Sequence, residues 1–241
     1  MKKFILCSSL FFSFIVSAQN YNAFLTDSVA HYKTLHNTNY LLPTIVDSSK
    51  IINNQNVYYF KSVNFFEYGM MENDQCLLND TSTNAWLGNA YVVADGDFDY
   101  LLNYFQDTIR IKKSALKDEI WTLIEFSNGN YIQANVDTIK EIEFNSISDT
   151  VKVIELSAFD EEGNPIESSP LHGLELFLSK NYGFLKCYNF IATTSVTPYG
   201  FFQVELFKLF NAQTNRFTTL KAHMYDFEEG DEFHYQQSGA I

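Results

Sequence analysis

The sequence predicts a mainly β protein, built on antiparallel sheet as a sandwich or a curled half-barrel, with one or two short helices. Three observations support this fold class. From Thr44 onward, short apolar or alternating runs are separated by turn residues, which is typical of strands. Hydrophobic residues make up 46% of the 241 residues and aromatic residues 17%, a composition that suits packed sheets and excludes a disordered chain. The pair Asn128-Gly129 also stands between two strand-like runs, as in a β-hairpin.

The two short helices are expected in the first half of the chain. Thr26 or Asp27 could cap a helix in which Val29, Tyr32 and Leu35 share one face. Residues 114–120 suit a second helix of one or two turns.

The strands are expected wherever β-branched and aromatic residues gather between turn signals. At Asn128-Gly129 we expect a type I′ turn, which needs positive φ at both central residues. In residues 139–144, Ile142 and Phe144 alternate with two glutamates, so one face of that strand should be packed and the other wet. The expected strands are residues 57–60, 63–66, 121–126, 131–136, 139–144, 151–159, 174–178, 184–190 and 201–210.

Residues 1–18 are typical of a secretory signal peptide. Lys2 and Lys3 give a basic start, the run 4–16 carries no charge, and small residues end it, so cleavage is expected between Ala18 and Gln19. The apolar run is too short to cross a bilayer, and we expect no transmembrane segment in the mature chain. The protein is therefore predicted to be exported to the periplasm, the cell surface or the medium.

The charge balance limits the partners. The net charge is −13, and it becomes more negative when the leader takes Lys2 and Lys3 away. Binding to nucleic acid or to an anionic membrane surface is not expected, because both need a basic surface. We expect one β-rich domain over residues 19–225 and an acidic tail over residues 226–241.

Two cysteines remain after the leader is removed, Cys76 and Cys187. Export to an oxidising compartment would allow a disulfide between them. Buried free thiols are the alternative, because a chain of this length can build its own core without a bridge.

Several phrases of the sequence together resemble the β-rich N-terminal region of secreted Bacteroidota proteins, which often carry a type IX secretion sorting domain. The resemblance covers residues 44–235 and implies an exported protein with no assigned activity. The related proteins continue into another module, so residues 226–241 could be the start of a truncated one. The phrases include Trp86-Leu87-Gly88, Asn128-Gly129-Asn130-Tyr131-Ile132, Asp149-Thr150-Val151-Lys152 and Gly230-Asp231-Glu232-Phe233-His234-Tyr235.

The string most like a ligand site is Asp95-Gly96-Asp97-Phe98-Asp99, because its three carboxylates would share one face of an extended chain. Hard oxygen ligands of this kind can hold calcium. The calcium-loop template, however, needs Gly at its sixth position and Glu at its twelfth, where this chain has Tyr100 and Gln106. A solvated acidic turn is therefore the favoured interpretation, and no resident cofactor is expected.

No catalytic motif appears in the sequence. The five histidines form no His-Glu-x-x-His string, and there is no Gly-x-Ser-x-Gly or phosphate-binding glycine loop. The favoured function is a non-enzymatic scaffold or a binding module for protein or glycan. The continuous aromatic run Tyr58-Tyr59-Phe60 must place rings on both faces of a sheet, so either both faces are covered or a ring patch is exposed for a partner. The alternative is a secreted hydrolase that uses an Asp/Glu pair in a closed pocket.

Overall fold

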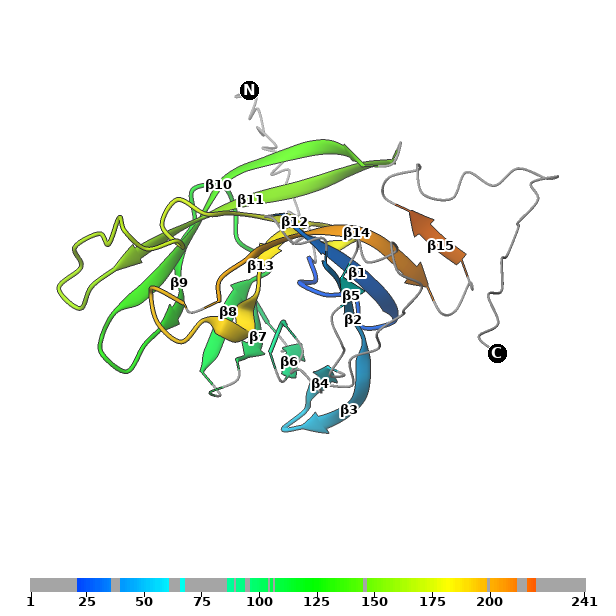
Figure 1. The fold of residues 1–241 in the computed structure, drawn as a ribbon, viewed down its shortest axis with the longest axis horizontal. Coiled ribbons are helices and arrows are strands. Elements are labelled where there is room, and N and C mark those ends of the chain that lie inside the picture. Colours follow the sequence, from blue (N-terminus) through cyan, green and yellow to red (C-terminus); the bar gives the residue numbers. More distant parts are fainter. Residues whose placement is uncertain are drawn as a thin grey trace, which may run out of the picture.

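Strands dominate the protein, as the sequence predicts. The computed structural model describes residues 21–35, 40–60, 66–67, 86–88, 90–93, 96–103, 105, 107–144, 147–198, 200–211 and 216–219. Within these residues the strands form two antiparallel sheets that curve around a shared interior (Figure 1). The mainly β, antiparallel fold class is confirmed.

The larger sheet has ten strands and combines the start of the described chain with its second half. It runs from β5 (Phe66–Glu67) to β9 (Ile120–Glu125), and β15 (Arg216–Thr219) pairs with β14 beside this path. Between these ends come β2 (Tyr40–Thr44), β1 (Ser28–Thr34), β14 (Gln203–Asn211), β13 (Gly183–Tyr188), β12 (Glu175–Ser179), β11 (Ile147–Phe159) and β10 (Tyr131–Phe144).

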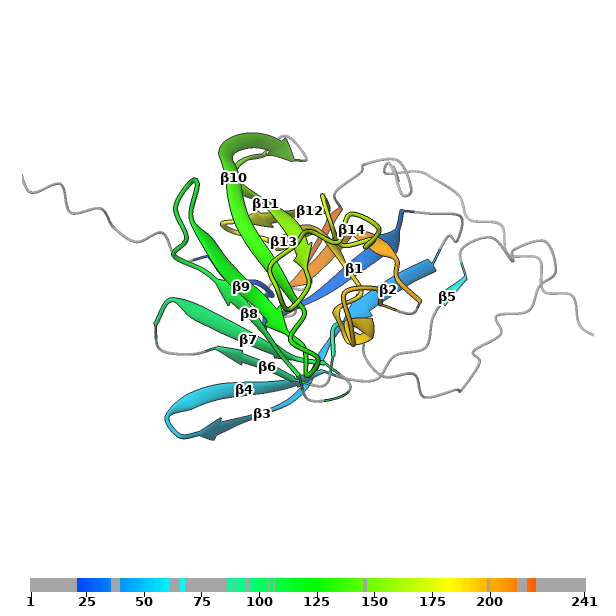
Figure 2. The same ribbon diagram turned by 90° about the vertical axis from the view of Figure 1, so that its left-hand side faces the viewer.

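The smaller sheet has five strands, in the order β3 (Val46–Ile52), β4 (Gln55–Phe60), β6 (Ala90–Val93), β7 (Phe98–Leu102) and β8 (Thr108–Lys112). The chain passes between the sheets at both margins, through Ile45 from β2 to β3 and through residues 113–119 from β8 to β9. At the second margin the Trp121 indole N–H donates to the Arg110 carbonyl oxygen at 2.9 Å. Figure 2 shows the smaller sheet curving away beneath the larger one.

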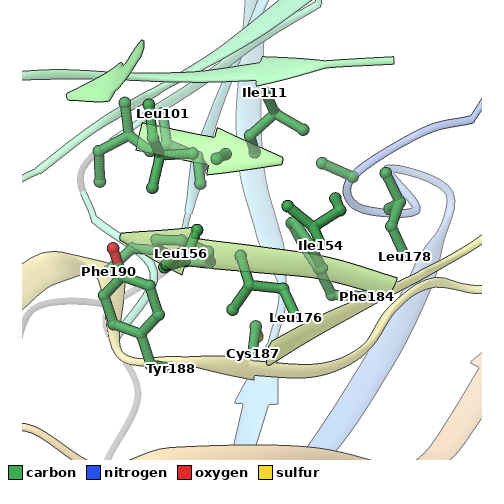
Figure 3. Packing of buried hydrophobic residues seen from close by; sticks show 14 of the residues in the cluster. Leu101, Ile111, Ile154, Leu156, Leu176, Leu178, Phe184, Cys187, Tyr188 and Phe190 are labelled. Atoms are coloured by element: carbon green, nitrogen blue, oxygen red, sulfur yellow. The ribbon is translucent and has the colours of Figure 1, made fainter. Parts of the chain in front are cut away.

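The hydrophobic core fills the space between the two sheets. Leu101 and Ile111 enter it from the five-stranded sheet, and they meet Ile154, Leu156 and other apolar side chains from the ten-stranded sheet (Figure 3). All four are at most 1% exposed. Burial of this apolar surface on both sheets is the main favourable contribution to folding.

The residues that precede β1 run through this core. In residues 21–24, which we call the N-terminal segment, Tyr21, Ala23 and Phe24 are at most 3% exposed. The Phe24 ring lies 5.9 Å from Phe60 and 5.5 Å from Tyr91, both in the smaller sheet. It also lies 5.6 Å from Phe184 in the larger sheet, so one side chain joins the two layers.

Both predicted helices are wrong. Residues 28–34 form strand β1, which pairs with β2 on one side and β14 on the other. Ala30 and Tyr32 alternate inward at a period of two, and the Tyr32 hydroxyl donates to the Phe184 carbonyl oxygen at 3.0 Å. Two flanking strands therefore outweigh the weak local helix pattern. Residues 114–119 form turns, and among the described residues the one helix is the 3₁₀ turn η1 (Phe190–Ala192).

The hairpin at Asn128-Gly129 is confirmed, but its expected turn type is wrong. Gly129 alone has positive φ, at 84°. The Gly129 N–H donates to the Phe126 carbonyl, and the Phe126 N–H donates to the Asn130 carbonyl. This is a three-residue loop with glycine in the left-handed position. Positive φ at two adjacent positions occurs instead at Asn53 and Asn54, between β3 and β4.

Gly183 tests whether the N-terminal segment holds the sheets together. Its φ is +72°, and a Cβ on it would lie 2.7 Å from the Ala23 carbonyl oxygen. Gly173 has a similar φ of +75° with nothing near its Cβ position, so it is a matched control. Both Gly→Ala variants carry backbone strain of roughly 1–2 kcal/mol. Gly183→Ala should lose clearly more stability than Gly173→Ala, because its new Cβ displaces the N-terminal segment.

The two variants should be compared by urea unfolding. Equal losses of stability would show that close packing of the N-terminal segment against β13 contributes nothing measurable.

Candidate functional site

The outer face of the five-stranded sheet is the strongest candidate for a functional surface. Strand register aligns Lys50, Val57, Val92, Tyr100 and Arg110 in one row across all five strands. Directly opposite residues of antiparallel strands point to the same side of a sheet. The neighbouring row contains the buried core residues Tyr91, Leu101 and Ile109, so the row from Lys50 to Arg110 faces outward.

This outer face is rich in apolar and aromatic side chains. Val57 and Ala90 are only 7% and 2% exposed, although they lie outside the central core cluster. The Tyr59, Phe98 and Tyr100 rings remain partly exposed around them. Phe98 and Tyr100 stack with ring centroids 6.5 Å apart and an interplanar angle of 24°. The surface therefore presents flat rings over a tightly packed centre.

Three cations, Lys50, Arg110 and Lys112, lie on this face. Lys50 places its ammonium 5.6 Å from the Tyr59 ring centroid, and Lys112 lies 5.7 Å from that of Phe98. Lys112 also pairs with Glu119, whereas Lys50 and Arg110 are exposed. The carboxylates within these five strands are Asp47, in the bulge of β3, and Asp99, which faces inward. The exposed Asp47 and the Glu119 that pairs with Lys112 therefore lie near a face whose cations are Lys50, Arg110 and Lys112, in a chain of net charge −13.

Sequence reasoning found only part of this surface. It singled out Tyr58-Tyr59-Phe60 and expected rings on both faces. The structure agrees, because Tyr58 and Phe60 contact Tyr91 in the core while Tyr59 lies beside Lys50. The alternating pattern of residues 108–112, with cations at the outward positions, was the signal that could have revealed the rest.

A second polar group lies inside the fold, at the edge of the core. The Asp99 side chain is 0% exposed, and its carboxylate pairs with the Lys113 ammonium at 2.8 Å. It also accepts a short hydrogen bond from the Tyr91 hydroxyl. Burial, together with the negative charge of Asp99, raises the pKa of Tyr91 well above its ordinary value. This group of charges is paired internally, as buried charges must be.

Lys152 extends this polar group to the N-terminal segment. Its ammonium donates to the Lys113 carbonyl oxygen and lies 3.9 Å from the Tyr21 ring centroid. Lys152 is 3% exposed, and burial lowers its pKa to about 8, against the opposing attraction of Glu119. Burial is also the main cause of the raised pKa of the Tyr21 hydroxyl.

The calcium candidates are not gathered into one site within the described residues. Asp97 is exposed just before β7, whereas Asp99 faces the core and pairs with Lys113. Asp95 lies outside the described residues. No cluster of three or more His, Cys, Asp or Glu side chains suited to a metal occurs in the part of the chain that the structure describes.

The cysteine prediction remains untested. Cys187 lies fully buried in β13, and burial raises the pKa of its thiol well above the ordinary value. Cys76 lies outside the described residues, as do Ala18, Gln19 and the acidic tail at residues 226–241. The disulfide, the cleavage site and the domain boundaries therefore stay predictions.

A hydrolase would need a carboxylic acid whose pKa is raised toward neutrality. Glu119, Glu141 and Asp160 all have pKa values below the ordinary value for a carboxylic acid. Hydrogen bonds from Lys112, Thr150 and Asn164, respectively, are the largest causes. These shifts keep the three groups ionised and give no support to a general acid.

No family model matches the chain, and no curated protein or solved structure is significantly similar to it. Within the described residues there is also no helix with the length and hydrophobicity needed to cross a bilayer.

Asp99 and Asp97 offer a matched test of the buried ion pair. Asp99→Asn should destabilise the protein by about 3 kcal/mol, because it removes the negative charge that pairs with the largely buried Lys113 ammonium at 2.8 Å. Asp97→Asn changes an exposed carboxylate two residues away and should shift stability by less than about 0.5 kcal/mol. Urea unfolding at pH 7 measures both, and similar small losses for the two variants would contradict the pairing.

Lys152 makes stability depend on pH. Its pKa is about 8 in the folded protein against an ordinary 10.5, so between these values the unfolded chain binds more protons. Stability should therefore rise with pH in this window, by about 2 kcal/mol between pH 7.5 and 9.5. Lys152→Met should remove this rise, whereas the exposed Lys180→Met should keep it. Parallel curves for wild type and Lys152→Met in urea titrations would refute the assignment.

Proposed function

We propose that this protein is an exported, non-enzymatic binding module for protein or glycan, which docks its ligand on the outer face of the five-stranded sheet. This proposal rests on the outward row from Lys50 to Arg110. Tyr100 lies within the row, and Tyr59 and Phe98 lie beside it. Export rests on residues 1–18 and on the resemblance to secreted Bacteroidota proteins, and the acidic composition suits solubility outside a cell.

Partly exposed rings on an otherwise packed face favour binding over a purely structural role. Aromatic residues and arginine are enriched in binding surfaces, because they combine a large apolar area with hydrogen-bonding groups. Tyr59 and Tyr100 have this character, and the neighbouring Lys50 and Arg110 could orient a bound ligand through its polar groups. Figure 2 shows that the strands of the larger sheet lie on one side of the smaller sheet, so its other face is turned away from them.

The rings on this face can be tested against an aromatic ring on the other sheet. The double variant Tyr59→Ser/Tyr100→Ser should reduce retention of cell-envelope glycans or proteins on the immobilised protein by about tenfold. Tyr131→Ser is the control, because Tyr131 is also partly exposed and stacks on Phe159 at 5.2 Å on the larger sheet. Thermal unfolding of each variant confirms that it is folded.

Retention that is unaffected by the double variant would refute this surface as the docking site. Failure of the wild-type protein to retain any glycan or protein would refute the binding function itself.

A further inference from the structure

The charge pattern of the docking face narrows the class of ligand, on the basis of the function proposed above. We infer that the ligand is a linear polysaccharide with carboxylate groups, a polyuronate, laid across the strands along the row from Lys50 to Arg110. The row begins and ends on a cation, and between them stand Val57, Val92 and Tyr100. The inference commits to this single occupant.

The spacing of the two cations suits an extended chain with repeated charges. Neighbouring strands lie about 4.8 Å apart, so four steps from β3 to β8 separate the ends of the row by roughly 19 Å. A compact ligand with one acidic group cannot reach both Lys50 and Arg110. A polymer with a carboxylate on successive sugars can, and its intervening rings then lie over the apolar centre.

The chemistry of the side chains also fits uronic acids. The guanidinium of Arg110 can bind a carboxylate through two parallel hydrogen bonds. Tyr100, directly opposite Arg110 in the register, offers a ring face to the apolar side of a sugar and a hydroxyl to its polar edge. Lys50 lies over the Tyr59 ring and repeats this combination of a cation and a ring at the other end.

The net charge of the whole chain restricts where a polyanion can bind. The net charge of −13 opposes the approach of a polyanion, so binding needs a face where cations are gathered, as Lys50, Arg110 and Lys112 are on this one. A nucleic acid would demand many more phosphate contacts than two exposed cations and one paired lysine provide. A peptide that adds as a strand would use a sheet edge rather than this face.

The test measures binding of polygalacturonate to the protein by affinity electrophoresis at 50 mM NaCl. Wild type should be retarded, and the retardation should disappear near 500 mM NaCl because salt screens exposed charges. Lys50→Gln/Arg110→Gln should weaken binding about tenfold. The control Lys117→Gln/Lys180→Gln removes two exposed cations in turns elsewhere and should leave binding unchanged.

Polyglutamate and a neutral glucan separate the two parts of the recognition. Polyglutamate has carboxylates without sugar rings and the glucan has rings without charge, so each should bind more weakly than polygalacturonate. Equal or tighter binding of polyglutamate, of the glucan or of single-stranded DNA would overturn the inference. Equal losses of polygalacturonate binding in Lys50→Gln/Arg110→Gln and in the control Lys117→Gln/Lys180→Gln would also overturn it. One outcome separates this inference from the proposed function. If Tyr59→Ser/Tyr100→Ser reduces retention of envelope ligands but the wild type does not bind polygalacturonate, the polyuronate assignment fails and the binding function stands.

Discussion

Packing of the N-terminal segment between the two sheets is the constraint on which much of the structure depends. Phe24 contacts rings from both layers, and the Phe184 N–H donates to the Ala23 carbonyl oxygen at 3.0 Å. The Tyr91 ring, which Phe24 contacts, carries a buried hydroxyl that donates a hydrogen bond to Asp99. The Tyr21 ring forms a cation–π contact with the Lys152 ammonium. The N-terminal segment thus places the Phe24 ring among the aromatic side chains of both sheets and the Tyr21 ring against the buried polar group.

The polar group at the edge of the core and the polar face outside it follow opposite rules. Inside, Asp99 and Lys113 are paired, because an isolated buried charge would cost several kcal/mol. Outside, Lys50 and Arg110 remain exposed beside aromatic rings, where water and any ligand can reach them. The interior group therefore contributes to stability, and the outer row is the surface on which we propose that a ligand binds. The two are separated only by the alternation of side chains along β7 and β8.

Many of the strands could be predicted from the local sequence, whereas the pairing between strands could not. The strands at β4, β9, β11, β12 and β13 coincide with runs of β-branched and aromatic residues that the sequence already marks. Two expected strands, residues 131–136 and 139–144, are one strand with a bulge near Asp137. Residues 28–34 read weakly as a helix because Val29, Tyr32 and Leu35 share a helical face. Pairing with β2 and β14 makes them a strand, and no local pattern contains that information.

The amino-acid sequence by itself determined the mainly β class, the hairpin at Asn128-Gly129 and the expectation that aromatic rings occupy both sides of a sheet. Those properties follow from local conformational preference and from the two-residue period of a strand. Only the tertiary structure decided that Asp99 turns inward to Lys113 instead of joining Asp97. It also decided that Lys50, Tyr100 and Arg110 share one row, because register brings together residues that are far apart along the chain.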